Sequence, residues 1–140
     1  MTEGQSTFPR RDTAGRISGL GDLLGVVLAG LVVGVLALVL FDWVVTIMGT
    51  GEFGRANGWL ALILPAWIFV EDFRAWPSGP ARVVTALVSA AVAVTAGLLA
   101  AGLAQELPTL WSGALAATVA AGAYAAIWFH VIRWLDRRTG

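Results

Sequence analysis

Four apolar stretches, separated by short polar segments, occupy most of the chain. A bilayer has a hydrocarbon core about 30 Å thick, which a helix of roughly 20 apolar residues can cross. Three of the stretches meet this length, whereas the stretch between Arg55 and Glu71 is shorter and contains Pro65. The pattern predicts an all-α integral membrane protein, an antiparallel bundle of four transmembrane helices. The expected spans are residues 20–48, 56–72, 83–104 and 109–132.

The second stretch allows three interpretations. Residues 56–70 are uncharged, and about 15 residues of helix are roughly 22 Å long. A buried core helix, a re-entrant segment and a short membrane span all match that length. The span is favoured because only an even number of spans keeps the arginine-containing segments on one side of the membrane.

Arginine distinguishes the two sides of the predicted bundle. With four spans and a cytoplasmic N-terminus, eight of the nine arginines fall in cytoplasmic segments and Arg55 alone falls outside. Short cytoplasmic loops of membrane proteins carry an excess of Lys and Arg. We therefore expect both ends inside, with residues 1–19 and 133–140 as cytoplasmic tails. The interfacial belts typical of Trp are expected to hold Trp43, Trp59 and Trp111 outside and Trp76 and Trp134 inside.

Composition supports a membrane protein and excludes several other classes. The chain has 140 residues, of which 58% are hydrophobic and 13% charged, whereas soluble domains are about one-quarter charged. The net charge of zero argues against nucleic acid as a partner. The absence of Cys excludes disulfides and thiolate sites. The use of Arg without Lys, with abundant Ala, Gly and Val, indicates a high-GC bacterial genome and hence the cytoplasmic membrane.

Small residues recur at four-residue spacing along the predicted helices. Helices in lipid associate through close packing, which small side chains permit. The expected packing residues are Gly30 and Gly34 in the first helix, Ala93 and Gly97 in the third, and Ala117 and Ala121 in the fourth. We expect the third and fourth helices to form the tightest interface.

Asp42 is the acid nearest to the interior of a predicted span. Ionisable residues within a span are functional candidates because burying their charge is costly. Counting about 20 residues from Leu20 places Asp42 at the outer boundary, beside Trp43. A solvated interfacial aspartate is the favoured interpretation, and a role in ion, proton or ligand handling is the alternative. Arg55 is a possible partner in either case.

A second group of candidates lies at the predicted cytoplasmic ends. Glu71, Asp72 and Arg74 follow the second stretch, and the favoured interpretation is a solvated helix end with a local ion pair. The alternative is that the carboxylates of Glu71 and Asp72, together with His130 of the fourth helix, form a metal site or a proton relay. One His without Cys is a weak metal signal. The glycine pattern of residues 49–54 follows a membrane helix rather than a strand, so it does not indicate a nucleotide, and we expect no cofactor.

Three functional hypotheses remain from different classes. An accessory, scaffold or assembly subunit of a membrane complex is favoured, because it needs small-residue interfaces and no catalytic set. Its expected partners are the lipid bilayer and either another membrane protein or further copies of the chain. A small oligomeric transporter or channel is the second hypothesis, although residues 23–41 contain no acid. An intramembrane enzyme is the third, and it would need a nucleophile and base at depth.

Overall fold

The structure is a computed structural model, which describes residues 10–13, 15–49 and 57–139 of the chain. These residues are helical for the most part and contain no strand, so the predicted all-α class is confirmed. The helical elements are α1 (Leu20–Ile47), the 3-10 helix η1 (Gly58–Leu62), α2 (Ile63–Ala75), α3 (Pro80–Leu103) and α4 (Thr109–Thr139). Within the described part, α1, α3 and α4 are long and apolar enough to cross a membrane.

The helix ends follow from local sequence. The chain leaves α1 through Gly49, whose φ of +77° lies in the left-handed region that glycine adopts without strain. α2 ends directly before the Trp76–Pro77 pair, where the proline disfavours helical geometry in the residue that precedes it. Gly79 has a φ of +155°, and Pro80 then occupies the first position of α3, where its missing N–H is not needed.

The second apolar stretch forms η1 followed by α2 rather than one continuous α-helix. Asn57 begins η1, because its side chain accepts a hydrogen bond from the Trp59 N–H at 3.0 Å. Pro65 is the third residue of α2, and the first turn of an α-helix is where proline is best accommodated. Proline is therefore tolerated at this position, and it does not break the stretch.

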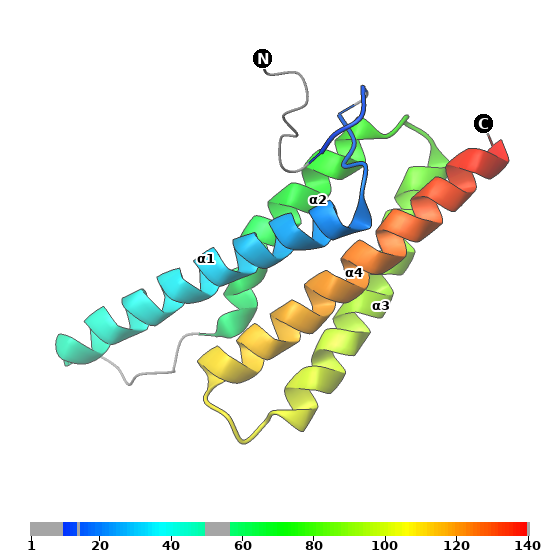
Figure 1. The fold of residues 1–140 in the computed structure, drawn as a ribbon. Helices are drawn as coiled ribbons and strands as arrows, with labels where there is room; N and C mark the ends of the chain where they lie inside the picture. Colours follow the sequence, from blue (N-terminus) through cyan, green and yellow to red (C-terminus); the bar gives the residue numbers. More distant parts are fainter. Residues whose placement is uncertain (1–9, 14, 50–56, 140) are drawn as a thin grey trace, which may run out of the picture.

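α4 lies at the centre of the arrangement and packs against every other helical element, most extensively against α3. Figure 1 shows α3 and α4 side by side as a hairpin, with α1 on the other side of α4. We call the described residues before α1, residues 10–13 and 15–19, the N-terminal segment. One end of the molecule contains this segment, the end of α2, the start of α3 and the end of α4. This end contains the eight described arginines, and we refer to it as the arginine-rich end.

Glycines of α1 contact the second stretch. A Cβ added at Gly34 would lie 3.0 Å from the Ala61 Cα, and one added at Gly30 would lie 3.2 Å from the Leu64 Cβ. The residue numbers rise along the second stretch as they fall along α1, so the two segments run antiparallel. Small residues here allow close backbone contact, as expected for helices in lipid.

The expected packing residues of α3 and α4 do not all lie between those two helices, because Ala117 and Ala121 of α4 belong to a core formed with α1, η1 and α2. Ala93, Ala117 and Ala121 are buried. A Cβ added at Gly97 would lie 3.0 Å from the Ala116 carbonyl oxygen and 2.6 Å from the ring of Trp59. Trp59 of η1 therefore packs on α3 as well.

A closer backbone contact lies between η1 and α4. A Cβ at Gly58 would lie 2.0 Å from the Leu110 carbonyl oxygen, and a Cβ at Gly113 would lie 2.6 Å from the Gly58 nitrogen. Only glycine fits at either position. The expectation that α3 and α4 make the tightest interface therefore overlooked this contact, because it considered small residues only within the long apolar helices.

Candidate functional site

Asp72 lies on the buried face of α2. Pro65, Phe69 and Asp72 are the buried residues of this helix, and their spacing of four and three positions is that of a single helix face. Asp72 is 1% exposed. The interpretation of Asp72 as part of a solvated helix end is therefore wrong. Asp72 lies on the same buried face of the helix as Pro65 and Phe69, although its neighbours in sequence are polar.

Two neutral donors satisfy the Asp72 carboxylate. The indole N–H of Trp128 donates to Oδ2 at 2.7 Å, and the backbone N–H of Ile17 donates to Oδ1 at 3.1 Å. Trp128 belongs to α4, whereas Ile17 precedes α1, so one side chain connects three parts of the chain. A buried carboxylate without such donors would be strongly destabilising.

Arg133 of α4 completes the group. Its Nη2 donates to the carbonyl oxygen of Ile17, while its guanidinium lies 3.8 Å from the centre of the Phe129 ring. The backbone N–H of Ile17 is thus bound by the Asp72 carboxylate, and its backbone carbonyl is bound by the Arg133 guanidinium. The Ile17 side chain is 1% exposed and belongs to the hydrophobic core. We call Ile17, Asp72, Trp128 and Arg133 the clasp.

The segment before α1 is folded onto the helix ends, although the sequence indicated only a tail there. An isolated β-bridge joins Arg11 and Ile17, and the Asp12 carboxylate accepts hydrogen bonds from the backbone and side chain of Arg16. Arg10 donates to Asp22 of α1 at 2.7 Å from its backbone and 3.0 Å from Nε. These contacts fasten the segment both to itself and to α1. The hydrogen bond to Asp22, together with its negative charge, raises the pKa of Arg10.

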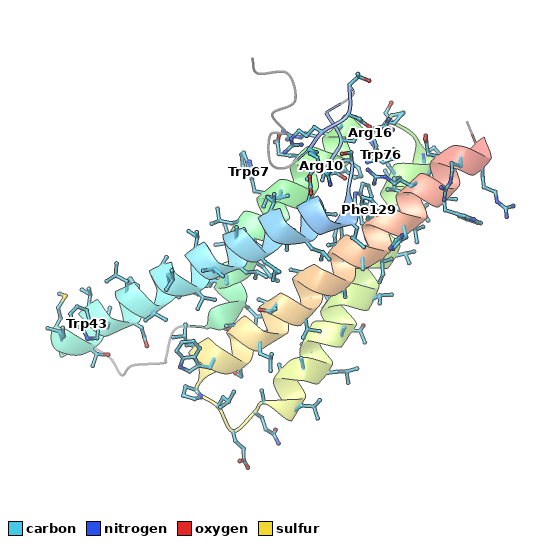
Figure 2. The ribbon with its side chains drawn as sticks, in the orientation of Figure 1. Arg10, Arg16, Trp43, Trp67, Trp76 and Phe129 are labelled. Carbon is cyan, nitrogen blue, oxygen red and sulfur yellow. The ribbon has the colours of Figure 1, made fainter. Side chains whose placement is uncertain are left out.

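Aromatic rings and guanidinium groups gather above the clasp. The Arg16 guanidinium lies 4.2 Å from the centre of the Trp76 ring, and Figure 2 shows both residues close to Phe129 at the arginine-rich end. Trp76 is 4% exposed. The prediction that Trp76 sits in an interfacial belt is therefore wrong, because the N-terminal segment and Arg133 cover its ring.

Glu71, Arg74 and His130 do not join Asp72 in a site. Glu71 and Arg74 form an exposed ion pair at 3.8 Å, a kind that contributes under about 1 kcal/mol. His130 is exposed and lies edge-on to Phe129 at 5.5 Å. Among the described residues, no three His, Cys, Asp or Glu side chains are placed to hold a metal ion. The geometry gives no support to a metal site at this end.

Asp42 differs from its favoured interpretation. It is 3% exposed and hence buried, whereas the adjacent Trp43 is 53% exposed and projects at the far end of α1 in Figure 2. The prediction of a solvated Asp42 is wrong, because counting along a helix gives depth in the membrane but not the lateral contacts of a side chain. Arg55, its expected partner, lies outside the described residues, as do residues 50–54 of the glycine-rich loop.

Sequence reasoning missed most of the clasp. Arg133 was expected only to set the topology, Ile17 was placed in a cytoplasmic tail, and Trp128 was not a candidate. One signal was present, since Asp72 falls three positions after Phe69 and four before Trp76, which is the spacing of one helix face. The contact between Asp72 and Ile17, which are 55 residues apart, has no sequence signal.

An apolar hollow lies between α2, α3 and α4, and its lining residue Tyr124 stacks on Trp128 of the clasp at 6.1 Å. Its volume is about 140 Å³, below the 300–1,000 Å³ that is usual for ligand pockets. Its lining consists of apolar and small side chains with Tyr124. The clasp, by contrast, joins three parts of the chain through hydrogen bonds. No protein-family model, curated protein or solved structure matches the chain.

Proposed function

We propose that the second stretch also crosses the membrane, which gives four spans. The combined length of η1 and α2 is about 30 Å, at 2.0 Å per 3-10 residue and 1.5 Å per α-helical residue. Gly58 lies against Leu110 near the start of α4, and Asp72 contacts Trp128 much further along that helix. The rise from Leu110 to Trp128 is about 27 Å, close to the thickness of the hydrocarbon core.

The position of arginine supports a cytoplasmic location for both ends. The eight arginines of the arginine-rich end belong to the N-terminal segment, α2, α3 and α4. They lie together although they are distributed over the whole sequence. The positive-inside rule assigns such an end to the cytoplasm, so the proposed arrangement is N-in and C-in within a bacterial cytoplasmic membrane.

The proposed function is that of an accessory, scaffold or assembly subunit of a membrane complex. The observation behind it is the use of Asp72 within the clasp, where both carboxylate oxygens accept hydrogen bonds from the chain itself. A buried charge engaged in this way stabilises one arrangement of helices. The outer half of α1 meanwhile exposes a row of large apolar side chains to lipid or to a partner. They include Val33, Leu36, Leu40, Phe41 and Ile47.

Purification in a mild detergent tests this function. The tagged chain is expected to retain one or more different membrane proteins in fixed stoichiometry. Phe41→Ala, within the exposed row of α1, should weaken their retention, whereas the matched change Trp134→Ala at the other end of the molecule should not. Recovery of the chain by itself, in lipid as well as in detergent, would contradict the proposal.

A small oligomeric transporter or channel is the second candidate, and the burial of Asp42 favours it. An ionisable group buried in a span is a functional candidate because its placement is costly. Asp42→Asn keeps the size of the side chain and removes its charge. If the protein transports an ion or a cationic solute, flux into proteoliposomes should be lost in this variant while expression and folding persist. Unchanged flux would remove Asp42 from the pathway.

A further inference from the structure

A polar hollow lies at the arginine-rich end, where the N-terminal segment meets the last turns of α4. Its volume is about 220 Å³, below the range of pockets that enclose a whole ligand, so only a small headgroup fits. The charged residues of its wall come from both elements, and they are Asp12, Arg16, Arg133, Asp136 and Arg137. Because the first two belong to the N-terminal segment and the others to α4, the hollow exists only while that segment is folded onto the helix ends.

Two of the arginines are held in place beside the ring of Trp76, which also lines the hollow. The guanidinium of Arg16 lies 4.2 Å from the centre of this ring (Figure 2), and that of Arg133 lies 5.2 Å from it. Asp12 fixes Arg16 further, because it accepts hydrogen bonds from the backbone N–H at 3.0 Å and from Nε at 2.9 Å. Arg16 has no other acceptor among the described residues, and its side chain is 24% exposed. Its terminal nitrogens can therefore donate to a ligand.

The wall of the hollow carries an excess of positive charge. Arg16 and Arg133 pack on one ring although their charges repel each other. Arg137 follows Arg133 by four positions, which places it on the same helix face, and it is exposed. Three arginines and two aspartates leave the wall with a net charge of +1. A ligand with a single negative charge offsets this excess and reduces the repulsion.

The position of the hollow suits a lipid headgroup. α4 is long and apolar enough to cross a membrane, and Asp136 lies four residues beyond Ile132, the expected end of the span. That distance is a rise of about 6 Å, which reaches from the hydrocarbon core into the headgroup region. Basic pockets at this level bind the phosphate groups of lipids. Guanidinium groups match phosphate because their planar donors bind two oxygens at once.

We propose that this hollow binds the phosphodiester of an anionic phospholipid, for which phosphatidylglycerol has the matching headgroup. Arg16 donates from the N-terminal segment and Arg137 from α4, so the lipid joins the two elements. A phosphodiester has one negative charge, which equals the excess on the wall. Phosphatidylethanolamine adds an ammonium group and is neutral overall, so it does not offset that excess. The inference requires a membrane location but neither a partner protein nor a particular number of spans.

Native mass spectrometry of the full chain in mild detergent tests the site. Phosphatidylglycerol, phosphatidylethanolamine and phosphatidylcholine with identical acyl chains, and inorganic phosphate, are titrated in separate experiments. We expect phosphatidylglycerol to bind most tightly. Arg137→Gln removes a donor to the phosphate, so the affinity for this lipid should fall about tenfold, the effect of losing one hydrogen bond to a charged group. Arg138→Gln changes the net charge equally, but the Arg138 guanidinium packs on Trp134, 4.7 Å from its ring centre, so the affinity should not change.

A second variant should act in the opposite direction. Asp136 is exposed, and Asp136→Asn removes a negative charge from the wall, so phosphatidylglycerol should bind more tightly. Equal affinities of Arg137→Gln and Arg138→Gln for this lipid would overturn the proposal, because binding would then not depend on the hollow. Phosphatidylethanolamine that binds as tightly as phosphatidylglycerol would also overturn it, as would unchanged or weaker binding in Asp136→Asn. Binding of inorganic phosphate that no lipid displaces would assign the site to free phosphate instead.

Discussion

At the scale of single residues, Asp72 has the largest predicted effect on stability. Asp72→Asn replaces one acceptor oxygen by an NH₂ group, which cannot accept from either Ile17 or Trp128. One buried donor is then left without a partner, which costs about 1–3 kcal/mol. The free energy of unfolding in detergent, measured by denaturant titration, should fall by this amount. Glu71→Gln, at the exposed neighbour, should change it by less than about 0.5 kcal/mol.

The hydrogen-bonded pair of Asp72 and Trp128 permits a sharper control. Trp128→Phe keeps an aromatic ring between Phe73 and Tyr124 and removes the N–H. If the carboxylate and the indole act together, the double variant should lose less stability than the two single variants combined. Additive losses would mean that the hydrogen bond of 2.7 Å does not couple the two residues.

Single residues also show where sequence reasoning stops. Helical spacing assigns Asp72 to the buried face of α2, whereas its place in the sequence beside Glu71 and Arg74, both exposed, suggested a solvated helix end. The burial of Asp42 could not be obtained in this way, because α1 is apolar all round and has no polar face. Periodicity distinguishes buried from exposed positions only where water faces one side of the helix.

At the scale of elements, close contact between η1 and α4 depends on two glycines. Gly58→Ala would place a methyl group 2.0 Å from a carbonyl oxygen of α4, so the backbones must separate. Overpacking of this kind costs typically 1–3 kcal/mol. Gly122→Ala is the matched control, because no atom lies within 4 Å of an added Cβ there and alanine favours a helix. The midpoint temperature of thermal unfolding in detergent should fall clearly for Gly58→Ala and should not fall for Gly122→Ala.

The N-terminal segment is expected to open when the clasp is weakened. Arg133→Gln removes the charged donor to the Ile17 carbonyl, so the segment should detach more often from the helix ends. Trypsin cleavage after Arg10, Arg11 or Arg16 is followed by mass spectrometry. It should become roughly tenfold faster if the free energy of detaching the segment falls by about 1.4 kcal/mol. Arg138→Gln, an exposed position on the same helix, should not change the rate. Equal rates for the two variants would contradict a structural role for Arg133.

Elements were predicted better than their contacts. The expected spans 20–48, 83–104 and 109–132 agree closely with α1, α3 and α4, except that α4 continues to Thr139. Long apolar runs determine such helices almost by themselves. The division of the second stretch into η1 and α2, and the folded segment before α1, depend on contacts between distant residues, which single-sequence patterns do not contain.

At the scale of the whole molecule, the arrangement separates a polar end from an apolar body. The clasp and the guanidinium–aromatic contacts gather at the arginine-rich end, whereas the half of α1 farthest from that end and one face of α3 expose large apolar side chains. Such surfaces destabilise a protein in water but suit a bilayer. This separation agrees with the charge distribution from which the topology was inferred.

The number of spans is the property of the whole molecule that most needs a test, and the absence of Cys makes the test clean. Single cysteines at Ser78 and Gln105, both exposed, place a thiol at the α2–α3 turn and the α3–α4 turn. With four spans and both ends inside, a membrane-impermeant maleimide added to intact cells should label Gln105→Cys and not Ser78→Cys. If η1 and α2 did not cross, the pattern would be the reverse, because the later spans would change direction. Thr13→Cys, before α1, should stay unlabelled until the cells are opened, which reports the N-terminal side separately from the number of spans.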